Sequence, residues 1–123
     1  MGEAEREALI LLAYLLVQHG RLEKAETLLA ALAEIFPEDG EAARLLADCL
    51  LKKGDYQEAV SVTSRICTEP NLDSTERRLA ELMRAQALWG QVSETPREDL
   101  KVELAESLAA YLRMTEETGR PTP

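Results

Sequence analysis

Two copies of one short phrase lie 34 positions apart in the chain, and this repeat restricts the fold more than any other feature of the sequence. The first copy is Gly20–Ala25 and the second is Gly54–Ala59, and an apolar run precedes each of them. Internal similarity at a spacing of this size is typical of proteins that stack pairs of antiparallel helices. We therefore predict an all-α chain built as a solenoid of helix pairs.

Each part of the phrase has a physical role in such a pair. The glycine favours the left-handed backbone conformation that ends a first helix. The closing alanine lets the second helix approach the first closely, where a larger side chain would hold the two apart. Pro37 and Pro70 cannot continue a helix, so we expect them to end the second helix of each pair.

The same pattern predicts about six helices. We expect them at residues 4–18, 22–35, 41–53, 56–67, 75–89 and 96–117. Gly90 begins a third copy of the phrase, but Ser93–Arg97 stands where the alanine should be, so the third repeat is irregular. An alternative is two repeats followed by a helical hairpin that caps them.

These helices are expected to form one domain over residues 1–117. Its repeats would cover 6–39, 40–73 and 75–117, with a flexible tail at 118–123. Leucine and alanine supply most of the 46% hydrophobic content, while aromatic residues supply 4%, which favours packed helices over a β-sandwich.

The charge of the chain restricts its partners. A net charge of -9 disfavours binding to nucleic acid or to anionic membrane surfaces, because both attract basic patches. The longest apolar run, Ala8–Val17, is too short for membrane insertion, which needs about 20 residues. The acidic start lacks the basic region of a secretory signal, so we expect a cytoplasmic protein with protein partners.

No group of residues predicts catalysis, and we expect neither an enzyme nor a cofactor or metal site. The single histidine, His19, lies near a predicted helix end, where a cation is favoured by the helix dipole. Cys49 and Cys67 lack metal-ligand spacing. We interpret them as buried thiols in a reducing compartment, with a disulfide or a reactive thiol as the alternatives.

The repeated residues resemble the tetratricopeptide (TPR) pattern of large and small apolar residues, a turn glycine, an alanine and a closing proline. The resemblance implies that the first helix of each pair lines a concave groove that binds a protein partner. Mapped onto this chain, the groove residues are Ile10, Tyr14 and Val17, then Arg44, Asp48, Leu51 and Lys52, and finally Ala80, Arg84 and Ala87.

The first predicted helix is more apolar than its own pair requires. Packing in the pair is expected to use Leu9, Leu12, Ala13 and Leu16, which leaves Ile10, Leu11, Tyr14, Leu15 and Val17 in need of cover. A partner's amphipathic helix or apolar segment could supply it. The alternatives are cover by the sixth helix or by the chain's own N-terminal segment, and a homodimer in the absence of a partner.

The opening run ends in Gln18-His19-Gly20 and is followed by a leucine-rich segment that ends at Pro37. In this it resembles the SctY (YscY-type) chaperones of type III secretion, which hold a small export substrate. The resemblance implies a cytoplasmic TPR chaperone in a heterodimer with a small partner. The alternative hypothesis is a general TPR adaptor or scaffold that has no part in secretion.

Overall fold

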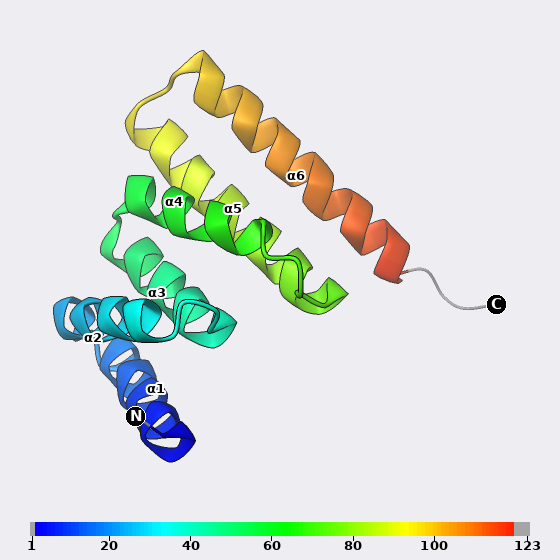
Figure 1. Cartoon of the computed structure of the whole chain (residues 1–123). Helices are drawn as coiled ribbons and strands as arrows, with labels where there is room; N and C mark the ends of the chain where they lie inside the picture. Colours follow the sequence, from blue (N-terminus) through cyan, green and yellow to red (C-terminus); the bar gives the residue numbers. More distant parts are fainter. Residues whose placement is uncertain (1, 120–123) are drawn as a thin grey trace. The chain divides into compact units, whose positions relative to one another are not determined.

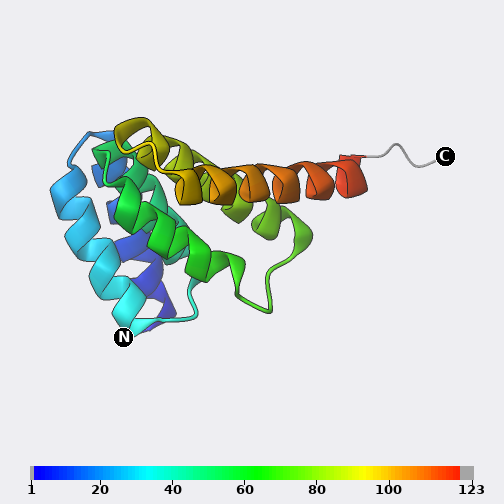
Figure 2. The same cartoon turned by 90° about the horizontal axis from the view of Figure 1, so that it is seen from above.

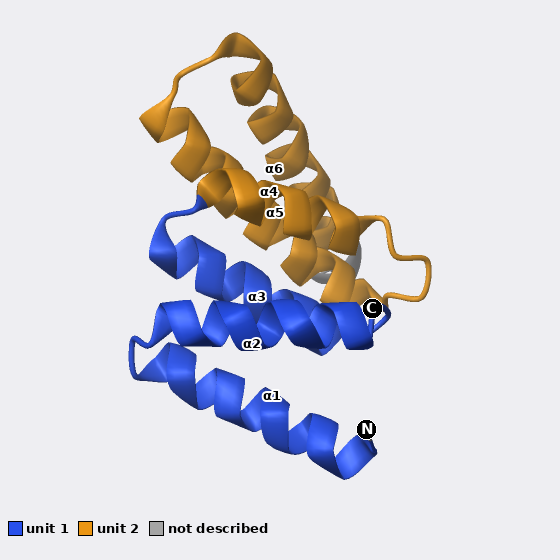
Figure 3. Cartoon of the chain, turned by 60° about the vertical axis from the view of Figure 1, so that its left-hand side comes forward, with its two compact units in different colours: residues 1–55 blue, residues 56–123 orange. Residues whose placement is uncertain are grey.

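The computed structural model describes residues 2–119, and over that range the chain forms six helices joined by loops (Figure 1). The helices are α1 (Glu3–Gln18), α2 (Leu22–Ile35), α3 (Gly40–Lys53), α4 (Tyr56–Cys67), α5 (Ser74–Glu94) and α6 (Glu98–Gly119). The prediction of an all-α stack of helix pairs is confirmed. The chain divides into two compact units, residues 1–55 and 56–123, which Figure 3 colours separately.

Unit 1 contains α1, α2 and α3, and α2 packs against both of the others (Figure 1). The buried side chains of α2 are Ala25, Leu29 and Leu32, which recur every three or four residues and so lie on one face. Ala25 has no exposed surface, in keeping with the close helix approach expected there. Gly20 and Gly54 follow the ends of α1 and α3 with φ of 74° and 81°, the left-handed conformation that the sequence predicts.

Unit 2 contains α4, α5 and α6, and α5 packs against both of the others. Figure 2 shows α6 running back alongside α5. Four buried side chains from α5 and α6 form a core cluster, with Val60 and Val92 packed against it: Ala85, Leu88, Leu100 and Leu104. Asp73 caps α5, since its carboxylate accepts a hydrogen bond from the Glu76 backbone N–H at 2.8 Å.

The predicted end of the fifth helix is wrong, because α5 continues through Gly90 to Glu94. Gly90 is buried within the helix, and the ring of Tyr56 occupies the space that a Cβ atom at this position would need. This glycine therefore allows α4 to approach α5 closely and does not form a turn.

Because α5 is longer than predicted, α6 begins later in the sequence than predicted. The sixth helix begins at Glu98 and not at 96, and it continues to Gly119. The first two residues of the expected tail are thus helical, and 120–123 lie outside the described residues.

A polar group joins the three helices of unit 2. Glu81 is buried, and its Oε1 atom accepts hydrogen bonds from Ser107 Oγ at 2.7 Å and from Arg84 Nη1 at 3.1 Å. Burial, followed by the nearby Glu81 carboxylate, raises the pKa of the Cys67 thiol to about 12.

The other cysteine, Cys49 in unit 1, also has a raised pKa, chiefly through burial, and its thiol donates a hydrogen bond to the Leu22 carbonyl at 3.2 Å. Both thiols are free.

We predict that Gly90→Ala destabilises the chain even though alanine is the better helix former. Alanine would add about 1 kcal/mol of helix propensity, but the overlap with Tyr56 should cost roughly 1 to 3 kcal/mol more than that. Urea unfolding followed by circular dichroism measures the difference. Ser93→Ala, at an exposed position of the same helix, is the control, and a Gly90→Ala protein at least as stable as wild type would contradict the predicted packing.

A second prediction concerns the Cys67 thiol. Because the pKa of this thiol is about 12, the reactive thiolate should be scarce at pH 8. Alkylation of Cys67 should therefore be slower in the folded chain than in the urea-unfolded chain, by a factor of roughly 100 or more. Iodoacetamide labelling followed by peptide mass spectrometry resolves Cys67 from Cys49. Equal labelling rates for Cys67 in the folded and unfolded chains would contradict the burial of this thiol and its raised pKa.

Candidate protein-interaction site

The ten residues expected to line a groove do not all reach the surface. Four of them are buried, with at most 6% of the residue exposed: Ile10, Val17, Ala80 and Ala87. In α1, Ile10 and Val17 flank the buried Ala13 at spacings of three and four residues, so they belong to the face by which α1 is buried. The structure leaves these four side chains no surface to offer a partner.

The other unit 1 residues of this set are more accessible. Tyr14 is 47% exposed, Lys52 is exposed, and Arg44, Asp48 and Leu51 are half-buried. The Lys52 ammonium lies 3.1 Å from the Asp48 carboxylate one turn before it on α3. These two charges therefore compensate each other within the helix, and pairs of this kind contribute little to stability.

Arg84 is the charged member of the set in unit 2, and it is held by its own unit. Besides Glu81, its guanidinium contacts Ser64 Oγ at 3.3 Å and the Glu103 carboxylate at 3.7 Å. Because three neighbours already use its donors, Arg84 positions α4, α5 and α6 and is poorly placed to bind a ligand.

The exposed apolar surface of α1 agrees only in part with the expectation. The sequence pattern predicts that Leu11, Tyr14 and Leu15 need cover, and they are 58%, 47% and 44% exposed. It predicts Leu12 in the contact between paired helices and Ile10 at the surface, whereas Leu12 is 47% exposed and Ile10 is buried. We call Ala8, Leu12, Leu15 and His19 the outer stripe, since their spacing of four, three and four residues puts them on one face of α1.

A hollow of about 620 Å³ opens beside the outer stripe, between α1 and the start of α2. Three leucines and three basic or imidazole residues line it, and we call the leucines its floor and the others its rim: Leu12, Leu15 and Leu16, then His19, Arg21 and Lys24. Arg21 and Lys24 are exposed, and among the described residues neither side chain forms an ion pair. An apolar floor with a positive rim is thus present on a chain whose net charge is -9.

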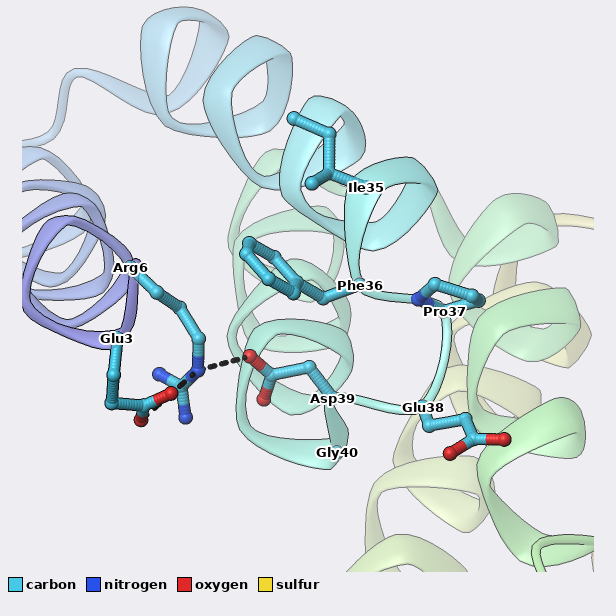
Figure 4. A pocket seen from close by; sticks show the side chains of 8 residues that line it. All are labelled: Glu3, Arg6, Ile35, Phe36, Pro37, Glu38, Asp39 and Gly40. Atoms are coloured by element: carbon cyan, nitrogen blue, oxygen red, sulfur yellow. Dashed lines mark ion pairs between the residues drawn. The ribbon is translucent and has the colours of Figure 1, made fainter. Parts of the chain in front are cut away.

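A second hollow in unit 1, shown in Figure 4, is a structural junction. Asp39 caps α3, and its Oδ1 atom accepts from the backbone N–H groups of Glu41 and Ala42 at 3.0 and 3.2 Å. Arg6 extends from α1, and its Nε atom lies 3.0 Å from the other carboxylate oxygen of Asp39. The Asp39 side chain is almost fully buried and paired with Arg6, so these two residues of the hollow join the start of α3 to α1.

Sequence reasoning missed the rim residues, although the sequence contains a signal for them. Aligning the two repeat copies places Arg21 and Lys24 where the second copy has Asp55 and Glu58. A reversal of charge at matched positions in otherwise similar repeats marks a difference in surroundings. Comparing the two copies position by position therefore singles out the rim from the sequence alone.

The described residues offer little for other kinds of site. Within residues 2–119 no group of three His, Cys, Asp or Glu side chains could hold a metal ion. Over the same range, no helix has both the length and the apolar character needed to span a membrane.

The comparisons with known proteins agree with the geometry. A family profile described as "Tetratricopeptide repeat" matches residues 10–71, which is half of the chain and includes both copies of the repeated phrase. No curated protein and no solved structure matches the chain significantly. Residues 10–71 run from α1 to the connector after α4. The chain therefore belongs to the tetratricopeptide repeat family, whose fold serves protein–protein interaction.

Proposed function

We propose that this protein binds an apolar helix of a small partner protein and keeps that helix covered, in the manner of a chaperone. The observation that carries the proposal is the exposure of Leu11, Leu12 and Leu15 on α1, each at 44% or more, beside a hollow with a leucine floor. A contiguous exposed apolar surface of this kind marks an interaction site more often than does a single exposed leucine.

Burial of the exposed α1 leucines would contribute substantially to the free energy of binding. Fully burying a leucine side chain is worth roughly 1.5 to 3 kcal/mol, so covering three half-exposed leucines should contribute about 2 to 4 kcal/mol. Contacts of Tyr14, which is also half exposed, would add to this, because aromatic side chains are frequent anchors at interfaces. A partner helix anchored at i, i+3, i+4 and i+7 has the spacing to use these contacts.

We further propose that the partner is a small export substrate of a type III secretion system and that the complex is a cytoplasmic heterodimer. The support is the resemblance of the opening helix pair to SctY-type chaperones, together with the exposed α1 leucines. A second candidate is a general TPR adaptor, which membership of the family by itself supports. The two differ in how the free protein behaves, since a chaperone with an uncovered apolar helix should self-associate until its partner is present.

We predict that Leu15→Asp abolishes partner binding and leaves the fold intact. The partner is first identified by mass spectrometry of what co-purifies, and the pair is then reconstituted from purified proteins. An aspartate in the contact should weaken binding more than tenfold, because a buried unpaired charge costs several kcal/mol. Calorimetry measures the affinity, and circular dichroism checks the helical content.

Val102→Asp is the matched control for this change. Val102 is 54% exposed on α6, so the substitution introduces the same charge at an apolar surface position in the other unit. Unchanged binding by Leu15→Asp, or equal losses for both variants, would count against α1 as the binding surface. Sedimentation of the free chain separates the two candidates, because an adaptor should be monodisperse alone and a chaperone should become so only with its partner.

A further inference from the structure

The repeat supplies an internal template for what covers α1. On α3, the residues Ala42, Leu46, Cys49 and Lys53 follow one another at spacings of four, three and four and lie on one face. The Cys49 thiol donates to the Leu22 carbonyl, and the Lys53 ammonium lies 3.1 Å from the Glu23 carboxylate and also pairs with Glu26. This face of α3 is therefore covered by α2.

The equivalent face of α1 is the outer stripe. At the repeat spacing of 34 residues, the positions on α1 that correspond to Ala42, Leu46, Cys49 and Lys53 are Ala8, Leu12, Leu15 and His19. On α3, Leu46 is 7% exposed and Cys49 is fully buried, whereas Leu12 and Leu15 are 47% and 44% exposed. The same stripe is thus buried where a preceding helix covers it and open where none of the described residues does.

We propose that the partner contributes one α-helix that packs on α1 as α2 packs on α3, antiparallel to it, with acidic side chains beside His19, Arg21 and Lys24. The orientation comes from the template, in which the start of α2 lies against the end of α3. This inference rests on the proposed function and adds the register and the charge of the bound helix.

Charge complementarity supports an acidic partner over a second copy of the chain or a basic helix. In the template, the Glu26 and Glu23 carboxylates hydrogen-bond Lys53 and raise its pKa, which shows that acids of the covering helix reach the end of the helix they cover. His19 occupies the position of Lys53, and Arg21 and Lys24 add two cations beside it. In a helix with acidic residues in its first turn and apolar residues every three or four positions, the acids can pair with the basic rim and the apolar side chains can pack on the leucine floor.

The probe for this inference is a peptide with the sequence of α2, residues 22–35, titrated into the full chain. Nuclear magnetic resonance locates the binding site, and fluorescence anisotropy measures the affinity. We expect weak binding at the outer stripe that Leu15→Asp reduces at least tenfold and that Val102→Asp leaves unchanged. Peptide binding that Leu15→Asp does not affect would overturn the inference, since the peptide would then be replacing the chain's own α2 or binding elsewhere.

The register is tested by restoring the template's ion pair in trans. His19→Lys should tighten binding of the peptide roughly two- to fivefold at low salt, the range expected for an exposed ion pair. A peptide carrying Glu23→Gln and Glu26→Gln should show no such gain. A gain that persists with the glutamine peptide, or no gain with either peptide, would overturn the proposed register.

The identified partner separates failure of this inference from failure of the proposed function. A partner that Leu15→Asp releases but that His19→Lys does not bind more tightly would overturn the inference and leave the proposed function in place. A partner that binds Leu15→Asp as well as wild type would overturn both. If the free chain is a dimer that Leu15→Asp dissociates, the occupant is a second copy, and the inference of an acidic partner helix is wrong.

Discussion

Each helix of unit 1 is stabilised by burying one face against the helix beside it, and among the residues that the structure describes α1 has such neighbours on one side only. The face of α1 that contains Ile10, Ala13 and Val17 is buried, and the opposite face exposes Leu12 and Leu15. The repeats of a helical stack bury surface against their neighbours, and none of the described residues covers this opposite face of α1. The proposed function and the inferred register both depend on this uncovered face.

The helix pairs could be predicted from sequence because the signals that set them are local. The bounds of α2 and α4 agree with the prediction, and α1 and α3 each begin one residue earlier than expected. The fifth helix could not be predicted in the same way. Gly90 resembles the turn glycines Gly20 and Gly54 in its sequence context, but its role is set by the ring of Tyr56, which reaches it from another helix.

The site was harder to predict than the fold, because it depends on which face of a uniformly apolar helix is buried. Ten consecutive apolar residues, Ala8–Val17, give no contrast from which to choose a face. Family geometry predicts Ile10 and Val17 at the surface, whereas the structure buries them. The comparison of α1 with α3 at the repeat spacing supplies the missing contrast, because it shows which positions need a covering helix.

The accessibility of the α1 leucine methyl groups in the partner-free monomer is the most direct test of α1 as an uncovered binding surface. A soluble paramagnetic probe relaxes methyl signals in proportion to their exposure, and Leu29 and Leu32, which are almost fully buried, provide the internal reference. We expect strong relaxation for Leu11, Leu12 and Leu15 and weak relaxation for the reference leucines. Equal protection of both groups would contradict the proposal, because α1 would then be covered by its own chain and would offer no surface to a partner.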